Sequence, residues 1–171
     1  LAPWTYSNEE LLALEHEEIF RKTWQIVCHV SDLPKPGSYV TLDFYRESVV
    51  VIRDKEGEIC ALKNHCRHRA ARLLDEEKGE CKSRIQCPYH GWSYALNGEL
   101  KAIPRDGGFE GVDKAGLRLH MVQHEVFNGF VFVRLEDTGG MSVAEMWGDY
   151  TPNLAPYRFE ELVPTQPFRT S

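Results

Sequence analysis

The sequence lacks three features that would each define a class of protein. None of its apolar stretches is long enough to span a membrane, and its opening residues 1–4 lack the basic and apolar pattern of a signal peptide. It also lacks a basic surplus, because its formal net charge is −6. These absences argue against a membrane protein, an exported protein and a nucleic-acid binder, and we expect a cytoplasmic location.

Cysteine is scarce and odd in number. The five cysteines are Cys28, Cys60, Cys66, Cys81 and Cys87. An odd count in a chain without an export signal argues against a disulfide framework. Cys28 and Cys60 fall in apolar, strand-like stretches where cysteine acts as a small hydrophobic residue, and Cys81 lies in a charged segment that suggests no role. Metal binding is therefore the better interpretation for Cys66 and Cys87.

Runs of β-branched and aromatic residues with a period of two predict a mainly β fold, built as an antiparallel sandwich or meander. Turn residues at 54–57, 96–99 and 128–129 separate neighbouring strands. The predicted strands cover residues 24–30, 39–44, 48–53, 59–62, 84–86, 92–95, 100–102, 117–123 and 130–135.

Helices are expected only toward the two ends. The apolar spacing predicts an N-terminal helix over residues 8–22 and a short helix over residues 142–147. We divide the chain into an N-terminal helix and lead-in strand packing on the main domain (1–37), a β domain (38–136) and a connection toward a further domain (137–171). A first residue other than Met and a proline-rich tail lead us to expect a piece of a longer polypeptide.

Two short motifs each pair a thiol with an imidazole: Cys66-Arg67-His68 and Cys87-Pro88-Tyr89-His90. Each follows a predicted strand, so the two loops can fold toward a shared metal centre. Two Cys and two His suffice for a structural zinc ion, although zinc sites usually pair Cys with Cys and His with His. The alternative is a two-iron, two-sulfide cluster in which both Cys bind one iron and both His bind the other. The cluster requires each loop to reach both irons, and one ligand of each type in each loop allows this, so the spacing is compatible with either centre.

The residues around these motifs are more specific. Cys66-Arg67-His68-Arg69 and Cys87-Pro88-Tyr89-His90-Gly91-Trp92-Ser93-Tyr94 resemble the cluster loops of Rieske proteins, whose [2Fe-2S] centre has this ligand set. The resemblance implies a Rieske-type β-sandwich with cluster-binding loops, whose ligands are Cys66, His68, Cys87 and His90. It implies cluster surroundings or a partner-docking surface at Arg67, Arg69, Arg72, Tyr89 and Trp92. Ala70 departs from the pattern, because many relatives have Gly there, and it indicates a backbone conformation that tolerates a Cβ.

Within the Rieske proteins, the chain resembles the large (alpha) subunit of a Rieske non-heme iron oxygenase. Respiratory Rieske proteins usually carry an extra Cys in each loop and a membrane anchor, and neither is present in this sequence. The leading helix and the segment after residue 135 are not needed by a compact Rieske-type ferredoxin, which is the alternative interpretation. The resemblance implies a second domain with a mononuclear Fe(II) site, which this chain does not contain. Its expected reaction is hydroxylation of an aromatic ring or oxidative demethylation of a small molecule with dioxygen.

The resemblance also implies partners. A ferredoxin or flavin reductase is expected to deliver electrons, and the full-length protein is expected to form a homo-trimer or a hetero-oligomer with a beta subunit. Basic residues near the loops form either a solvated rim or a dock for an acidic ferredoxin; they are Arg67, Arg69, Arg72, Lys82 and Arg84.

Four further side chains are interpreted as structural residues. His120 and His124 are four residues apart in a predicted strand without a carboxylate motif beside them, so we interpret them as ordinary strand residues. Trp92 and Tyr94 are interpreted as core residues or as a cover for the cluster.

Overall fold

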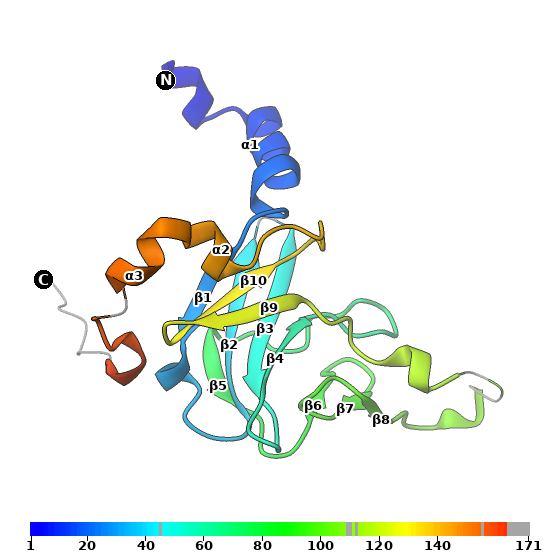
Figure 1. Cartoon of the computed structure of the whole chain (residues 1–171). Coiled ribbons are helices and arrows are strands. Elements are labelled where there is room, and N and C mark those ends of the chain that lie inside the picture. The colour runs from blue at the N-terminus through cyan, green and yellow to red at the C-terminus, as the bar shows by residue number, and fades with distance from the viewer. Residues whose placement is uncertain (45, 109–110, 112, 155, 164–171) are drawn as a thin grey trace, which may run out of the picture.

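The computed structural model describes residues 1–44, 46–108, 111, 113–154 and 156–163, and its strands form three antiparallel sheets (Figure 1). Their strand orders are β1-β10-β9, β4-β3-β2-β5 and β6-β7-β8. The mainly β, antiparallel fold predicted from the sequence is confirmed. The strands are β1 Gln25–His29, β2 Ser38–Phe44, β3 Glu47–Arg53, β4 Ile59–Lys63, β5 Lys78–Glu80, β6 Ile85–Gln86, β7 Ser93–Tyr94, β8 Leu100–Ala102, β9 Gln123–Phe127 and β10 Phe130–Arg134.

Strand β3 is central to the packing because both of its faces are buried. Four consecutive residues of this strand have no exposed surface. Since successive side chains of a strand point to opposite faces, Val49 and Val51 enter one hydrophobic core, which β1 and β10 also line. Val50 and Ile52 enter a second core together with Tyr94 of β7. The four-stranded sheet therefore lies between the other two sheets.

Two strands lead directly into the loops that carry the Cys/His motifs. Strand β4 ends at Lys63, just before the first loop, and β6 ends at Gln86, immediately before the second. Strand β7 begins at Ser93 and pairs with β6, which closes the second loop at its base. Both loops contribute a buried cysteine to the core that contains Tyr94. The packing of the second and third sheets thus brings the two loops together.

The structure corrects the predicted strand over residues 117–123. Residues 115–117 form a 3-10 turn, and the next regular strand is β9, Gln123–Phe127. Leu119 and Val122 are buried, so the stretch shows an apolar pattern, but it joins β4 through only an isolated bridge between Leu62 and Met121. The turn predicted at 128–129 does connect β9 to β10.

Strand β5 was not predicted. Its residues Lys78–Glu80 are all exposed and two of them are charged, so the sequence shows no alternation of apolar and polar residues there. It pairs with the edge of β2 through backbone hydrogen bonds. Charged residues on an edge strand protect a sheet from pairing with other chains.

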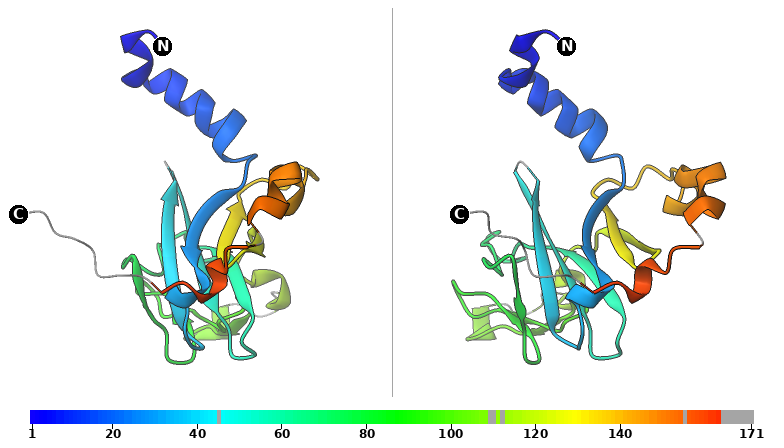
Figure 2. Two further views of the ribbon diagram at one scale, coloured as in Figure 1. Left: turned by 60° about the vertical axis from the view of Figure 1, so that its left-hand side comes forward. Right: turned by 90° about the vertical axis from the view of Figure 1, so that its left-hand side faces the viewer.

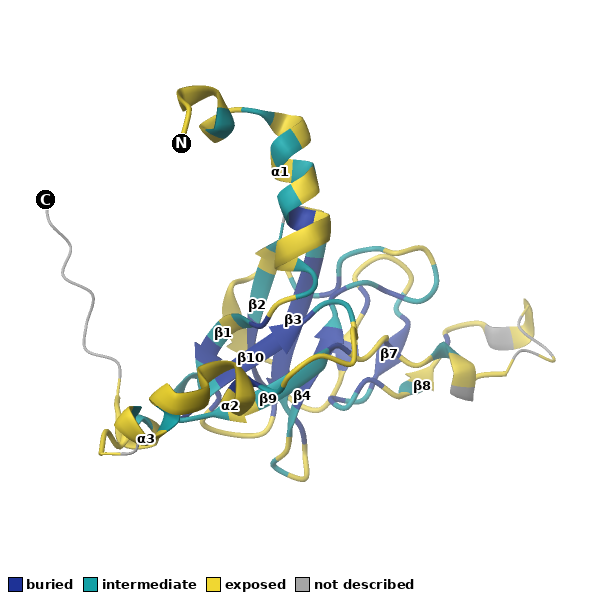
Figure 3. Cartoon of the chain, turned by 45° about the horizontal axis from the view of Figure 1, so that its top comes forward, coloured by how far each residue is buried: buried dark blue, intermediate teal, exposed yellow. Residues whose placement is uncertain are grey.

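The N-terminal helix stands away from the three sheets (Figures 1 and 2). It comprises α1, Glu9–Glu15, followed by a π-helical turn, His16–Phe20. All residues of α1 are at least partly exposed, as Figure 3 shows by colour, whereas His16 is buried. An ion pair between Arg21 and Glu47 of β3 fixes the end of this helical segment to the sheets. The domain division at residues 37 and 136 stays a prediction.

The C-terminal elements flank the first sheet (Figure 2). They are α2, Val143–Trp147, which confirms the predicted short helix, and α3, Thr151–Leu154. Arg134 of β10 is buried, lies over the ring of Trp24 at 4.5 Å and donates to backbone carbonyls of residues 140 and 141. Within the described ranges, the longest apolar helical stretch falls short of what a membrane span requires.

Candidate metal centre

The two Cys/His loops have the same backbone construction. In the first loop, Cys66 N donates to Ala71 O at 2.8 Å and Ala70 N donates to Cys66 O at 2.9 Å. In the second loop, Cys87 N donates to Trp92 O at 2.8 Å and Gly91 N donates to Cys87 O at 3.1 Å. Each cysteine is thus bonded to the residues four and five positions further along the chain.

The bases of the loops match as well. The residue before the first cysteine, His65, bridges to Arg72, and the residue before the second, Gln86, pairs with Ser93. Each bridging partner lies six positions after the cysteine. The two loops are therefore equivalent hairpin ends, although the histidine stands two positions after Cys66 and three positions after Cys87.

The fourth position after each cysteine has a left-handed backbone. Gly91 has φ +73°, and Ala70 has φ +53° at the equivalent place. A Cβ is disfavoured in this conformation, by about 1–2 kcal/mol. The expectation that the backbone at Ala70 readily tolerates a Cβ is therefore wrong: Ala70 adopts the conformation that a glycine would favour, and its exposed position leaves room for the methyl group.

The thiols face inward and the imidazoles lie further out. Cys66 and Cys87 are 4% and 3% exposed and belong to the core, whereas His68 is half-buried and His90 is exposed. The His68 and His90 rings have centroids 4.7 Å apart and are inclined by 70°. The Cys66 and Cys87 thiols are neighbours, and the presence of Cys87 raises the pKa of the Cys66 thiol. The structure therefore brings the candidate ligands together in two pairs, thiol with thiol and imidazole with imidazole.

Aromatic rings pack against both imidazoles. Trp92 is buried and stacks on His68, with ring centroids 5.0 Å apart and planes inclined by only 7°. The ring centroids of Tyr89 and His90 are 3.8 Å apart, but Tyr89 is 62% exposed. Trp92 thus supports the imidazole pair from the protein side, while Tyr89 presents an aromatic surface beside it to the outside.

Tyr94 makes a direct contact with a candidate ligand. Its hydroxyl oxygen lies 3.2 Å from Cys66 Sγ and accepts a hydrogen bond from the Arg67 backbone N at 3.1 Å. Because that N–H already occupies one side of the oxygen, the hydroxyl proton can point to the sulfur. The sequence interpretation of Tyr94 as core or cover missed this contact. A signal for it was its spacing of two residues from Trp92 in the predicted strand 92–95, since side chains two apart in a strand share a face.

Local electrostatics differ for the two ligand types. Burial raises the pKa of the Cys66 thiol; the Tyr94 hydrogen bond opposes this shift, and the neighbouring Cys87 adds to it. A thiolate at this depth needs a nearby positive charge, such as iron supplies. Partial loss of water and the neighbouring His90 lower the pKa of His68, which favours the neutral imidazole that binds metals.

The predicted basic rim is only partly available to a partner. Arg72 donates to Asp43 at 2.8 Å and lies 3.4 Å from Asp75, so its charge is paired. The Arg67 guanidinium contacts His120, whereas Arg69 is exposed, and no described residue forms an ion pair with it. Arg72 is therefore better interpreted as a structural residue that stabilises the base of the first loop through its ion pairs.

The two outlying histidines do not share a strand. His124 belongs to β9, and its Nδ1 lies 3.3 Å from Val122 O. His120 precedes β9 and contacts Arg67 in the first loop. The interpretation of His120 as an ordinary strand residue is therefore wrong.

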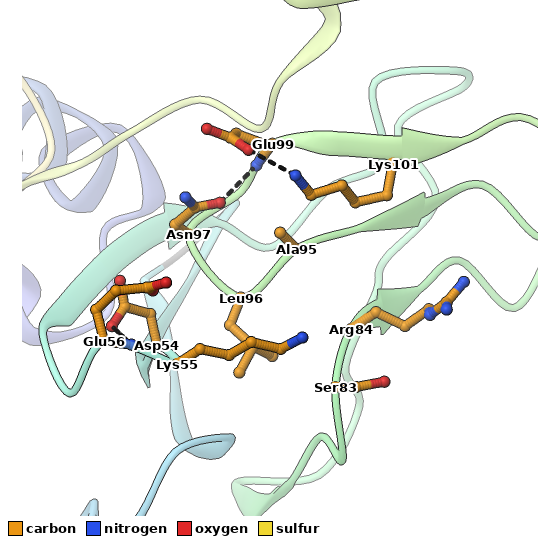
Figure 4. A pocket seen from close by; sticks show the side chains of 10 residues that line it. All are labelled: Asp54, Lys55, Glu56, Ser83, Arg84, Ala95, Leu96, Asn97, Glu99 and Lys101. Atoms are coloured by element: carbon orange, nitrogen blue, oxygen red, sulfur yellow. Dashed lines mark hydrogen bonds and ion pairs between the residues drawn. The ribbon is translucent and has the colours of Figure 1, made fainter.

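An open hollow lies at the other end of β4, away from the loops (Figure 4). Its lining is balanced in charge, with three acidic and three basic side chains, and Lys101 pairs with Glu99 at 2.8 Å. Figure 4 shows Lys55 and Arg84 on one side and this ion pair on another. The hollow contains no candidate ligand, and we assign no chemistry to it.

Comparison with known proteins identifies the family. The model described as "Rieske [2Fe-2S] domain" matches residues 23–115, which is 93 of the 171 residues. The chain belongs to this family, and its cofactor is the Rieske-type [2Fe-2S] cluster.

Its relatives are oxygenase subunits. The chain is 36% identical to the anthranilate 1,2-dioxygenase large subunit of Acinetobacter baylyi, over 84% of this chain and 31% of that protein. It is 34% identical to a glycine betaine monooxygenase oxygenase subunit of Pseudomonas aeruginosa, over 77% of this chain and 30% of that protein. The chain spans about a third of the length of these curated relatives.

Solved structures agree with these relatives. Naphthalene 1,2-dioxygenase with indole bound has a TM-score of 0.80 at 34% identity, over 88% of this chain and 34% of that one. A quaternary ammonium Rieske monooxygenase in complex with L-carnitine has a TM-score of 0.80 at 31% identity, over 89% of this chain and 43% of that one.

The candidate donors fit such a cluster chemically. They lie as two pairs, and among the described residues no three His, Cys, Asp or Glu side chains converge on a single metal position. Two ferric ions, two sulfides and two thiolates sum to zero charge when both imidazoles are neutral. Four thiolates would make the centre two charges more negative and harder to reduce, so the expected potential lies in the range of about −150 to +300 mV.

The backbone at Ala70 gives the first prediction. Replacing Ala70 by Gly should raise the free energy of unfolding by about 0.5–1 kcal/mol, because it removes the penalty of a Cβ at φ +53°. Urea unfolding measures this change. The adjacent substitution Ala71→Gly is the control and should destabilise, since Ala71 has an ordinary backbone and packs on the core. Equal destabilisation by both substitutions would refute the assignment.

The Tyr94 contact gives the second prediction. Tyr94→Phe should lower the reduction potential by roughly 40 mV, the equivalent of a hydrogen bond stronger by about 1 kcal/mol in the reduced state. A redox titration followed by visible absorption measures it. Tyr39→Phe changes another buried tyrosine of the same core and should leave the potential unaltered. An unshifted potential in Tyr94→Phe would show that the hydroxyl does not donate to the sulfur.

Proposed function

We propose that the chain is the electron-entry domain of a Rieske non-heme iron oxygenase and that Cys66, His68, Cys87 and His90 bind its cluster. The observation that carries the proposal is the division of the four donors into buried thiols and outward imidazoles on equivalent loops. Membership of the Rieske [2Fe-2S] family supports it. When bound, the cluster accepts and releases one electron at a time.

The residues around the donors form a buried inner side and an exposed outer side of the proposed centre. The buried thiols and Tyr94 hold the inner side in the core, where water is excluded. The imidazole of His90 is exposed, so its outer edge is the shortest route for an electron from a docked partner. Tyr89 lies against this imidazole, and it forms the proposed partner-facing surface together with Arg67 and Arg69, the sequence neighbours of His68.

The enzyme activity belongs to a longer polypeptide in this proposal. The matched relatives are more than twice as long as this chain, which leaves room for a second domain with a mononuclear Fe(II) site. The proposed reaction is dioxygen-dependent hydroxylation of an aromatic ring or oxidative demethylation of a small molecule. Relatives named anthranilate 1,2-dioxygenase and naphthalene 1,2-dioxygenase support the first class, and a relative named N,N-dimethyl phenylurea N-demethylase supports the second. A His/His/carboxylate set in the downstream sequence would identify that domain.

The proposed partners are a ferredoxin or flavin reductase and further subunits in a homo-trimer or hetero-oligomer. Names of relatives such as "large oxygenase component" and "subunit alpha" support a multi-component system. A free-standing ferredoxin and a zinc module are both less favoured, because the relatives are oxygenase subunits and the family cofactor is a [2Fe-2S] cluster. The cytoplasmic location stays a prediction.

Metal analysis tests the ligand set. The purified full-length protein should contain iron and acid-labile sulfide in the cluster, and should give a rhombic electron paramagnetic resonance signal when reduced. Cys87→Ala should abolish the signal and the labile sulfide. Cys28→Ala is the matched control and should keep both, because Cys28 lies in the other core, where burial raises its pKa to about 12. A wild-type protein that binds zinc and no labile sulfide would contradict the proposal.

Charge reversal tests the partner surface. Arg69→Glu should slow cluster reduction by an acidic donor at least severalfold at low ionic strength and leave the spectrum intact, because it replaces an exposed cation beside His68. Lys55→Glu, at the far end of β4, is the matched control and should have little effect. Stopped-flow reduction measures the rates. Equal rates for wild type and Arg69→Glu across salt concentrations would exclude docking at Arg69.

A further inference from the structure

His120 lies outside the two loops, and its imidazole contacts Arg67, which stands between two candidate ligands of the first loop. We propose that His120 is a positioning residue that holds the Arg67 guanidinium beside the first cluster loop, where its positive charge favours reduction of the centre. The inference rests on the proposed function, because it requires a redox centre between the two loops.

The contact between Arg67 and His120 has a definite direction. A guanidinium carries only donors, so Arg67 Nη1 donates and His120 Nε2 accepts. Desolvation lowers the pKa of His120 below its ordinary value of about 6.5, and the charges of Arg67 and Lys63 act in the same direction. The imidazole is therefore neutral at pH 7, and its proton resides on Nδ1.

His120 is itself fixed by the backbone around it. Its carbonyl accepts a hydrogen bond from Lys63 N, at the end of β4, at 2.9 Å. The preceding residue, Leu119, is fully buried, and its N donates to Gly98 O at 2.8 Å. The imidazole thus extends from a segment that is fastened to the second sheet and to the turn between β7 and β8.

Arg67 is held at both of its ends. Its backbone N donates to the Tyr94 hydroxyl, and its position between Cys66 and His68 fixes the start of the side chain. With the far end bonded to His120, the guanidinium cannot swing freely into water. Reduction adds one negative charge to the centre, so a fixed cation beside the loop raises the reduction potential. Removing His120 releases this cation to solvent, where its effect is screened.

A redox titration of the full-length protein tests the role of His120. His120→Ala should lower the equilibrium constant for one-electron reduction by about threefold, as expected for an exposed charge interaction. This threefold change corresponds to a reduction potential lower by about 28 mV, since a tenfold change in a one-electron equilibrium constant is about 59 mV. His120→Gln should keep the reduction potential close to that of the wild type, because the glutamine amide oxygen can accept the Arg67 hydrogen bond in place of Nε2.

Two controls separate positioning from a general structural effect. His124→Ala removes a histidine four residues away, in β9, and should leave the potential unchanged. In an Arg67→Met background, His120→Ala should cause no further shift, because no guanidinium remains to be held. An unchanged potential in His120→Ala, or the same shift in both backgrounds, overturns the inference. A wild-type protein without the rhombic signal would instead refute the proposed function.

Discussion

A pair of backbone hydrogen bonds in each loop determines how the candidate ligands are oriented. In both loops the cysteine N–H is bonded to the carbonyl five positions further on, and the cysteine carbonyl accepts from the fourth. This closes the chain around the thiol and points it into the core. The histidines stand in the middle of the same tight turns, so their rings lie further out. The difference between an inner and an outer side of the centre follows from this construction.

The surrounding fold keeps the two loops in register with each other. Strand β3 is buried on both faces and joins the sheets that lead into the loops, since Val50 and Ile52 pack in the same core as both cysteines. Tyr94 links the loops directly, because it belongs to the strand after the second loop and contacts Cys66 in the first. Rigid packing and one side-chain hydrogen bond therefore set the distance between the halves of the site.

The sequence was sufficient for the parts of the molecule that depend on pattern. Stretches rich in β-branched and aromatic residues identified β2, β3 and β4, and the paired Cys/His motifs identified the site. The sequence was insufficient where backbone pairing or contacts between distant segments determine the structure. The charged strand β5 has no apolar pattern. Leu119 and Val122 are buried like strand residues, but their stretch makes only an isolated bridge to β4.

The charge environment of the loops depended on contacts that sequence spacing does not reveal. Arg72 was expected on a free basic rim, but Asp43, 29 residues away in sequence, pairs with it. His120 was expected in a strand, but it contacts Arg67, which is 53 residues away. Both pairs join segments that are far apart in the sequence, so they cannot be read from local composition.

The division of the donors into a thiol pair and an imidazole pair is the central claim, and Mössbauer spectroscopy tests it most directly. Full-length protein enriched in the Mössbauer isotope of iron should show two iron environments in equal amounts, one with sulfur ligands only and one with nitrogen ligands as well. A spectrum with a single iron environment in the reduced and oxidised protein would contradict the claim.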